Sequence, residues 1–255
     1  MLPPLSIVCI TYGRTKQLAE LVQCYRRSVY AGEMQLVIVN DAPEQLLTMN
    51  LESVTVFNTL QRFPSDGEKR NFAIEHCKHE HFLCVDDDDL FLPWFAQDMM
   101  LSFLAWEKPT YPSTHIYAEG IKENTRMRYV ENSHPATYLC TKEQFRKAGP
   151  YNTVVPVGID QILRKSFIRA FDCHIIKHPL PQLIAGFIYR WANGTYHLSG
   201  STEHDTAWER CKADLQRRIE SGDEPTGIIE IEPKWEADYV KLALDTMEHL
   251  GHSGK

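Results

Sequence analysis

The sequence has no long apolar segment. No run of about 18 apolar residues, the length that crosses a bilayer as a helix, occurs in its 255 residues. Its first residues, Met1-Leu2-Pro3-Pro4, also lack the basic and apolar stretches of a signal peptide. We therefore expect a cytoplasmic protein without integral membrane association.

An excess of positive charge is absent as well. Lys and Arg total 27 against 34 for Asp and Glu, which gives a net charge of −7. No overall basic field therefore exists to drive non-specific binding to nucleic acids or membrane surfaces. The seven cysteines include no Cys-x-x-Cys pair, and several lie inside apolar runs. This pattern argues against a disulfide framework or a zinc site and favours buried, reduced thiols.

The sequence does contain enough apolar residues for a sizeable core, since 43% of it is hydrophobic. Its length fits one large α/β domain with a small appendage better than two ordinary domains. We expect a main domain over residues 1–201, with halves at 1–100 and 101–201, and a helical appendage over residues 202–255.

The first half of the chain alternates short apolar runs with helical patterns, as parallel βαβ units do. The runs predict strands at 6–10, 35–39, 53–57, 81–85, 116–121 and 137–140, and extended segments at 175–176 and 182–189. Helical spacing predicts helices at 16–30, 68–77, 94–106, 142–148, 160–171, 203–221 and 235–249, the first of them capped by Thr15. The pattern predicts an α/β fold with a mixed, mostly parallel central sheet flanked by helices.

Four adjacent aspartates, Asp86 to Asp89, lie between the strand predicted at 81–85 and another apolar segment. Adjacent carboxylates repel each other and raise one another's pKa unless a cation or hydrogen-bond donors compensate. Carboxylate oxygens suit Mg²⁺ or Mn²⁺, and carboxylates two residues apart on an extended chain point to the same side. The run predicts a divalent metal site that also binds a diphosphate. The alternative is a solvated acidic turn that caps the next helix.

Polar residues follow three of the predicted strands at their carboxyl ends. They are Thr11-Tyr12, Asn40-Asp41 and the aspartate run. In an α/β sheet, ligands bind beyond the carboxyl ends of the strands. An aromatic face, a carboxylate and a metal site at one edge of the sheet would suit a nucleoside diphosphate. Taken singly, Asp41 could be a turn residue and Tyr12 a core aromatic.

These motifs resemble those of glycosyltransferase family 2 and related GT-A enzymes. The matching stretches are Thr11-Tyr12-Gly13-Arg14, Val39-Asn40-Asp41, Gly67-Glu68-Lys69-Arg70-Asn71, and Asp86-Asp87-Asp88 at the family's Asp-x-Asp (DXD) signature. The resemblance is strong to Pro93 and loose to Ser201. It implies a GT-A, Rossmann-like fold in which residues 1–100 bind a nucleotide sugar and residues 101–201 bind the acceptor.

The resemblance also implies roles for individual residues. Binding of the nucleotide donor is implied for Thr11, Tyr12, Arg14, Asp41, Arg70, Asn71, Asp86 and Asp87. Asp88 would bind the metal, Mn²⁺ or Mg²⁺, although the run of four aspartates leaves Asp87 and Asp89 open as the ligand instead. Gly13 departs from the family, which usually has Asn or Asp at this position.

The second half offers a candidate catalytic base. Gly149-Pro150-Tyr151-Asn152 followed by Asp160 is similar to the family's Gly-Gly-Phe-Asp followed by a Glu-Asp pair, with Ile159 in place of the Glu. The resemblance makes Asp160 the base, and direct displacement at an anomeric carbon needs a carboxylate that takes the acceptor proton. The alternative is that Asp160 is a helix N-cap.

A polar and aromatic stretch, residues 189–199, follows the last predicted extended segment. Its Arg190 could neutralise a diphosphate, and Trp191 or Tyr196 could stack on a sugar. Some GT-A enzymes place a C-terminal histidine on the metal, and His197 resembles that ligand. His204 is a weaker substitute.

We therefore predict a metal-dependent hexosyl- or pentosyltransferase. It would move a sugar from a nucleotide diphosphate sugar, a UDP-sugar, to an acceptor hydroxyl group with inversion. The acceptor would be a glycan, a lipid-linked sugar or a hydroxymethylated DNA base. Four basic pairs could follow a DNA backbone, namely Arg126-Arg128, Arg146-Lys147, Arg164-Lys165 and Arg217-Arg218.

Two alternatives belong to other functional classes. A nucleotidyltransferase also combines such a sheet with carboxylates and metal, but the loop at residues 11–14 is too poor in glycine to grip a triphosphate. A non-catalytic nucleotide-sugar-binding module would bind the donor without turnover.

Overall fold

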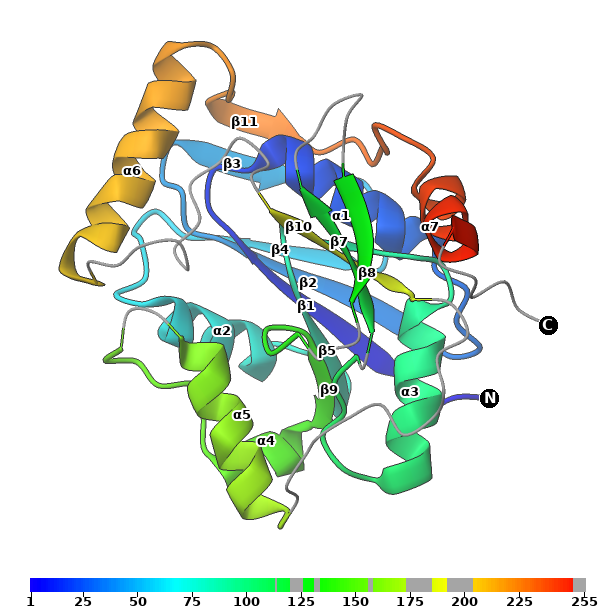
Figure 1. The fold of residues 1–255 in the computed structure, drawn as a ribbon. Coiled ribbons are helices and arrows are strands. Elements are labelled where there is room, and N and C mark those ends of the chain that lie inside the picture. Colours follow the sequence, from blue (N-terminus) through cyan, green and yellow to red (C-terminus); the bar gives the residue numbers. More distant parts are fainter. Residues whose placement is uncertain are drawn as a thin grey trace.

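The computed structural model describes residues 1–112, 114–119, 126–130, 134–155, 158–172, 185–191 and 204–249. A five-stranded sheet of order β4-β2-β1-β5-β9 runs through its centre (Figure 1). Its strands are β1 (Leu5–Thr11), β2 (Met34–Asn40), β4 (Val54–Asn58), β5 (His81–Asp86) and β9 (Tyr138–Thr141). The first four are parallel, and β9 is antiparallel to β5. The predicted mostly parallel sheet is confirmed.

Strand β1 is buried on both faces of this sheet. Leu5, Ile7 and Cys9 belong to one hydrophobic core, whereas Val8 and Ile10 belong to another. Successive side chains of a strand point to opposite faces, so a strand covered on both sides needs an unbroken apolar sequence. This requirement explains why the central strands could be predicted from apolar runs in the sequence.

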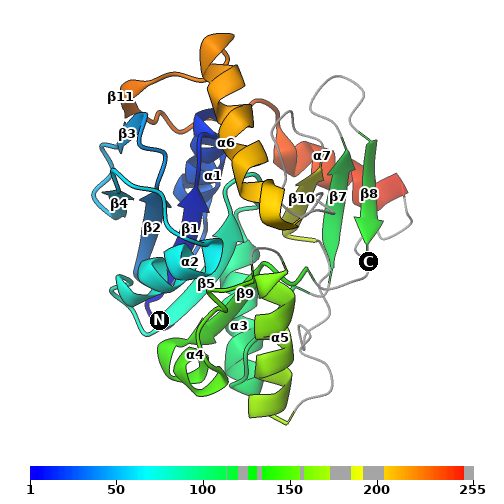
Figure 2. The same ribbon diagram turned by 90° about the vertical axis from the view of Figure 1, so that its left-hand side faces the viewer.

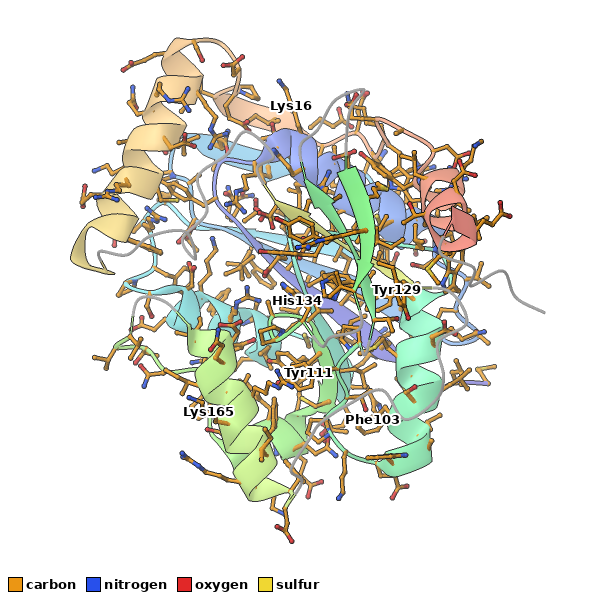
Figure 3. The ribbon with its side chains drawn as sticks, viewed as in Figure 1. Lys16, Phe103, Tyr111, Tyr129, His134 and Lys165 are labelled. Atoms are coloured by element: carbon orange, nitrogen blue, oxygen red, sulfur yellow. The ribbon has the colours of Figure 1, made fainter. Side chains whose placement is uncertain are left out.

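Helices cover both faces of the sheet (Figures 1 and 2). One core contains residues of α1 (Thr15–Arg27), α3 (Phe95–Trp106) and α7 (Tyr239–His249). The other contains residues of α2 (Asp66–Glu75), α4 (Lys142–Ala148) and α5 (Ile159–Ala170). Figure 3 shows the side chains: Phe103 and Tyr111 belong to the two cores, whereas Lys16 and Lys165 are exposed.

Two smaller sheets complete the described structure. One has the order β6-β10-β7-β8 and consists of β6 (Leu90–Phe91), β10 (Phe187–Trp191), β7 (His115–Glu119) and β8 (Arg126–Val130). In the other, β3 (Gln45–Thr48) pairs in parallel with β11 (Gly227–Glu230). The sequence did not predict β3, β6, β8 or β11.

The last described segment packs against the rest of the chain. It contains α6 (His204–Glu220), whose buried Leu215 lies against Gly13, and then β11 and α7. Helix α7 begins at Tyr239 and not at the predicted residue 235. Trp235 lies ahead of the helix, where its Nε1 donates a hydrogen bond to the Sγ of Cys24 at 3.3 Å. The division of the chain at residue 201 stays a prediction.

Helices α1 and α5 each begin one residue before the predicted start. Helix α1 begins at Thr15 itself, so Thr15 is not its cap, and its backbone N–H donates to Glu224 at 2.7 Å. Helix α5 begins at Ile159 after Gly158, which adopts a φ of 75° as the N-cap. Asp160 therefore lies inside the first turn of α5, and the N-cap alternative for this residue is excluded.

The cysteines that the structure describes are free thiols, and five of these six are buried. The prediction of buried cysteines is confirmed for Cys9, Cys24, Cys77, Cys84 and Cys140, whereas Cys211 is partly exposed. Within the described ranges, none of the helices is both long and apolar enough to cross a membrane. The predicted extended segment at 175–176 lies outside the described residues.

Candidate active site

The three polar strand ends lie at one edge of the central sheet. Strands β1, β2 and β5 are parallel, with Thr11 opposite Asn40 and Ile10 opposite Asp86. A cavity of about 320 Å³ lies at this edge. Its lining includes the predicted residues Thr11, Tyr12, Arg14, Arg70, Asp86, Asp87, Asp88 and Asp160. Many of the residues that line this cavity were therefore predicted from the sequence as site residues.

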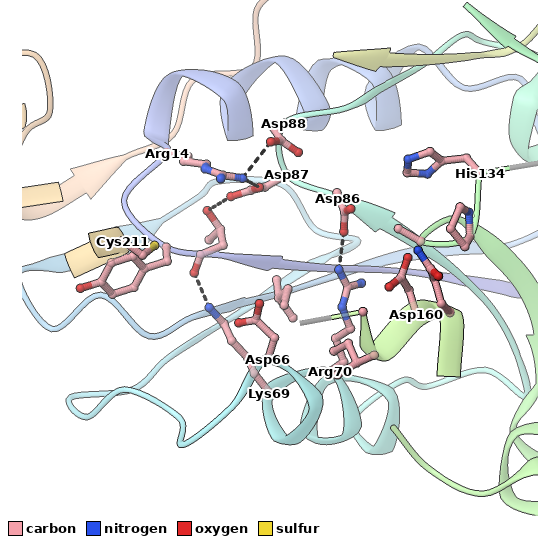
Figure 4. A pocket seen from close by; sticks show the side chains of 18 of the residues that line it. Arg14, Asp66, Lys69, Arg70, Asp86, Asp87, Asp88, His134, Asp160 and Cys211 are labelled. Carbon is pink, nitrogen blue, oxygen red and sulfur yellow. Dashed lines mark hydrogen bonds and ion pairs between the residues drawn. The ribbon is translucent and has the colours of Figure 1, made fainter. Parts of the chain in front are cut away.

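Asp87 anchors the loop that follows β1. Its Oδ2 accepts a hydrogen bond from the Thr11 hydroxyl at 2.7 Å, and its Oδ1 accepts one from Arg14 Nη1 at 2.7 Å. Arg14 Nη1 also donates to Oδ2 of Asp88 at 3.0 Å, and Figure 4 shows Arg14 beside both carboxylates. Both oxygens of Asp87 are thus bound by this loop, which leaves Asp86, Asp88 and Asp89 to consider as metal ligands.

Asp86, Asp88 and Asp89 can each offer a carboxylate oxygen, and these oxygens lie within 4.8 Å of one another. Asp89 is 1% exposed; its Oδ1 accepts the backbone N–H of Arg190 at 2.9 Å, whereas its buried Oδ2 has no partner among the described residues. Burial raises the pKa of Asp89 well above its usual range, and Asp88 and Asp86 raise it further. A divalent cation would relieve this repulsion and satisfy the unpaired oxygen, so the three residues fit a hard metal ion.

Asp86 differs from Asp89 because it has a cationic partner. Burial pushes the pKa of Asp86 upward, but the charge and hydrogen bond of Arg70 outweigh burial and hold this pKa below its usual value. Asp86 is therefore a carboxylate at neutral pH. Figure 4 shows Arg70 reaching it from helix α2.

Three of the predicted donor-binding residues, Asp41, Asn71 and Arg190, are not among those that line the cavity. Asp41 is 1% exposed, forms an ion pair with buried Lys69 and accepts the backbone N–H of Phe63 at 3.0 Å. Asn71 exchanges two hydrogen bonds with the backbone of Tyr151, at 3.1 and 2.9 Å. Both side chains hold neighbouring segments of the chain in place.

Arg190 also lies behind the cavity wall. It is 5% exposed, forms an ion pair with Glu20 and donates from Nε to the backbone oxygen of Asp88. These contacts hold the aspartate turn in place. The second predicted metal ligand, His197, lies outside the described residues, as does Tyr196.

Asp160 reaches the cavity from the first turn of α5. Burial raises its pKa, and the negative charge of Asp86 adds to this rise. His134 lines the cavity on the same side (Figure 4), and burial lowers its pKa to about 4, so it is neutral at physiological pH. A carboxylate whose pKa is raised toward neutrality is suited to general-base chemistry.

The sequence motifs did not identify several residues that line the cavity: Arg62, Asp66, Lys69, His134, Tyr189 and Cys211. Asp66, Lys69 and Arg70 are spaced by three and four residues, so they share one face of α2. This spacing could have identified Asp66 and Lys69. Cys211 belongs to α6, far along the chain, and no local pattern marks it.

A mostly parallel sheet covered on both faces, with an acidic cluster at its carboxyl edge, is the arrangement expected of a GT-A glycosyltransferase. More particularly, the chain belongs to glycosyl transferase family 2, whose family profile matches residues 6–170.

Solved structures of TarS from S. aureus share this fold. The structure of its residues 1–349 in complex with UDP-GlcNAc is 14% identical in sequence, with a TM-score of 0.57 over 98% of this chain and 72% of TarS 1–349. The complex of the same segment with UDP has a TM-score of 0.53 at 14% identity, over 85% of this chain and 72% of the other. No curated protein sequence matches the chain significantly.

Proposed function

We propose that this glycosyltransferase transfers a sugar from a UDP-sugar to an acceptor hydroxyl with inversion and with the help of Mn²⁺ or Mg²⁺. One observation carries the proposal: the metal-fitting carboxylates Asp86 and Asp88 and the candidate base Asp160 line the same cavity. The TarS structures with UDP and UDP-GlcNAc support a uridine nucleotide as the donor.

The proposed metal ligands are Asp88 with Asp86 and Asp89. When bound there, the cation would neutralise the negative charge that develops on the departing diphosphate. The nucleotide would lie along the loop after β1, with Thr11 and Tyr12 near its base and ribose and with Arg14 and Arg70 close to its phosphates. Arg14 and Arg70 already balance the aspartate charges, so this wall of the cavity can receive an anion.

Asp160 acts as the general base in this mechanism. Its carboxylate takes the proton from the acceptor hydroxyl while the acceptor oxygen bonds to the anomeric carbon of the donor. The bond between that carbon and the phosphate oxygen breaks, and the nucleoside diphosphate leaves with the electron pair. Attack from the face opposite the leaving group inverts the anomeric configuration.

We propose a glycan or a lipid-linked sugar as the acceptor. The alternative, a hydroxymethylated DNA base, rested on basic pairs that could track phosphates. One of these pairs is engaged within the protein: Arg218 is 7% exposed and binds Asp214 and Glu224, and Arg217 also binds Asp214. Arg218 is therefore not available to a DNA backbone, whereas the side chain of Arg217 is 64% exposed.

A thermal-shift panel tests the donor and the metal together. A ligand that binds only the folded state raises the apparent stability with its occupancy. We expect UDP to raise the melting temperature when Mn²⁺ is present, and to raise it less when EDTA replaces the metal. ADP and GDP are the matched controls. If no nucleoside diphosphate or nucleotide sugar stabilises the protein under any of these conditions, the proposed donor is wrong.

A further inference from the structure

Arg62, in the loop between β4 and α2, holds its guanidinium group between two aromatic rings. Its central carbon lies 3.7 Å from the ring centre of Tyr12 and 3.4 Å from that of Trp208. Contact between non-bonded carbon atoms begins at about 3.5–4.0 Å, so two rings cannot approach one carbon this closely from the same side. The rings therefore lie on different sides of the guanidinium group, and the space between them is called the slot below.

The polar contacts that hold Arg62 in this slot are few. Its Nη1 donates to the backbone oxygen of Trp208 at 3.3 Å, its side chain is also hydrogen-bonded to the Cys211 thiol, and its Nε is buried without a partner among the described residues. The described residues offer no carboxylate within ion-pair distance of Arg62, in contrast to Arg14 and Arg70. Stacking on the two rings is therefore the main interaction of this guanidinium, and another planar group can replace it.

The slot opens into the cavity of the active site. Tyr12 follows β1, and both Tyr12 and Arg62 line the same cavity as Asp86 and Asp88. Helix α6 supplies Trp208 and also Cys211, another lining residue. A nucleobase has the thickness of one aromatic ring, and every base has faces that stack on aromatic side chains.

We infer that Tyr12 and Trp208 form a clamp for the nucleobase of the donor, and that Arg62 competes with the base for the slot between them. The inference rests on the proposed function and deepens it. Trp208 lies outside residues 6–170, so the second wall of the clamp comes from beyond the segment that the family profile matches.

Calorimetric titration of the full chain with UDP in the presence of Mn²⁺ tests the clamp. Trp208→Ala should weaken UDP binding by about tenfold or more, as expected for a lost base-stacking contact. Trp208→Phe keeps a stacking face and should restore most of the affinity. Trp106→Ala, at the exposed end of α3, is the matched control and should bind UDP like the wild type.

Arg62→Ala tests the competition, because the proposal predicts a gain and not a loss. Removal of the guanidinium empties the slot, so UDP should bind several-fold more tightly than to the wild type. Weaker UDP binding by Arg62→Ala would instead mean that Arg62 contacts the donor, and this outcome overturns the competition.

Titration with pyrophosphate distinguishes a lost contact to the nucleobase from a general disturbance of the binding site, because pyrophosphate has no nucleobase. Trp208→Ala should bind pyrophosphate with wild-type affinity. Equal losses for UDP and pyrophosphate, or wild-type UDP affinity in Trp208→Ala, overturn the clamp while leaving the proposed function in place. If the wild type itself binds no nucleotide, the proposed function fails and the clamp fails with it.

Discussion

Asp160 and Asp86 line the same cavity, but the pKa values of their carboxyl groups shift in opposite directions. Burial raises the pKa of Asp160, whereas Arg70 keeps that of Asp86 low. The Asp160→Asn variant should retain donor binding, because the amide has nearly the same shape, and should lower kcat by about 10²- to 10⁴-fold through loss of the base. UDP release at saturating donor and calorimetric donor affinity measure the two effects. Wild-type turnover in this variant would place the base elsewhere.

The pH dependence of the rate gives a second test of Asp160. A general base works in its ionised form, so kcat/KM should fall as pH falls through the pKa of this carboxyl group. Because burial raises that pKa above the ordinary value of 3.8, the acidic limb should lie at a higher pH than for an exposed aspartate. The residual activity of Asp160→Asn should not fall over this acidic pH range. If the acidic limb of the pH profile persists in this variant, another group causes it.

The choice of metal ligand within the aspartate run can be measured directly. Asp88→Ala should remove the Mn²⁺ dependence of UDP affinity, since it deletes one carboxylate of the cluster. Asp245→Ala, which removes a surface carboxylate paired with Lys241, is the control and should retain that dependence. If Asp88→Ala retains the Mn²⁺ dependence of UDP affinity and Asp89→Ala loses it, the metal ligand is Asp89 and not Asp88.

At the scale of elements, the loop after β1 depends on α6. Gly13 adopts a φ of 63°, and an added Cβ would lie 2.3 Å from Cδ1 of Leu215, which is 1% exposed. The carbonyl of Gly13 also accepts a hydrogen bond from Arg218 at 2.6 Å. These contacts explain why a glycine stands where the family usually has Asn or Asp.

Gly13→Ala should therefore destabilise the protein more than an alanine at another left-handed glycine. Gly222 has a φ of 77° with nothing within 4 Å of an added Cβ, so Gly222→Ala isolates the backbone cost of about 1–2 kcal/mol. Gly13→Ala should cost about 1–3 kcal/mol more, because the buried leucine must move. Urea denaturation measures the free energy of unfolding of both variants. If both variants lose the same stability, Leu215 of α6 moves aside at no cost.

The elements that the sequence predicted are those with strong burial patterns. Strands covered on both faces appear in the sequence as apolar runs, and amphipathic helices appear as apolar residues at helical spacing. Strand β11 gives no such signal: Ile228 is 77% exposed, and the strand pairs only with short β3 in the described structure. Pairing between such segments depends on tertiary structure, which local sequence does not encode.

The candidate site was predictable to a similar degree. Thr11 and Asp86 follow apolar strands, so their places at the carboxyl edge could be inferred from the parallel arrangement. Trp208 and Cys211 are on a helix far along the chain, and only the folded structure brings them to the loop after β1. The buried ion pairs of Lys69 and Arg190 were also beyond prediction, because their partners are distant in sequence.

At the scale of the whole molecule, Glu224 ties the C-terminal segment to helix α1 and strand β3. Its Oε1 accepts the backbone N–H of Thr15 at 2.7 Å and the side chain of Gln45 at 3.3 Å, and its Oε2 accepts from Arg218 at 3.1 Å. The side chain is 3% exposed, so these bonds lie in an environment with little water. The segment that follows α6 is therefore held by a buried polar network as well as by apolar packing.

Glu224→Gln should lower the free energy of unfolding by about 1–3 kcal/mol, because it leaves the buried Arg218 with less compensating charge. Glu236→Gln removes a carboxylate from an exposed pair with Lys234 and should cost only about 0–1 kcal/mol. Denaturation followed by both fluorescence and circular dichroism measures the difference. If the two variants lose the same stability, the buried network does not support the fold.

The bond between Thr15 and Glu224 joins residues that are 209 positions apart in the chain. A ribosome that adds about 5–20 residues per second therefore makes the loop after β1 roughly 10–40 s before its partner emerges. During this interval the nascent chain can form strands β1, β2 and β5, yet the loop beside the cavity lacks the helix that packs on it. The donor site thus matures late in translation, and a chain stalled before α6 would carry the aspartates without the finished pocket.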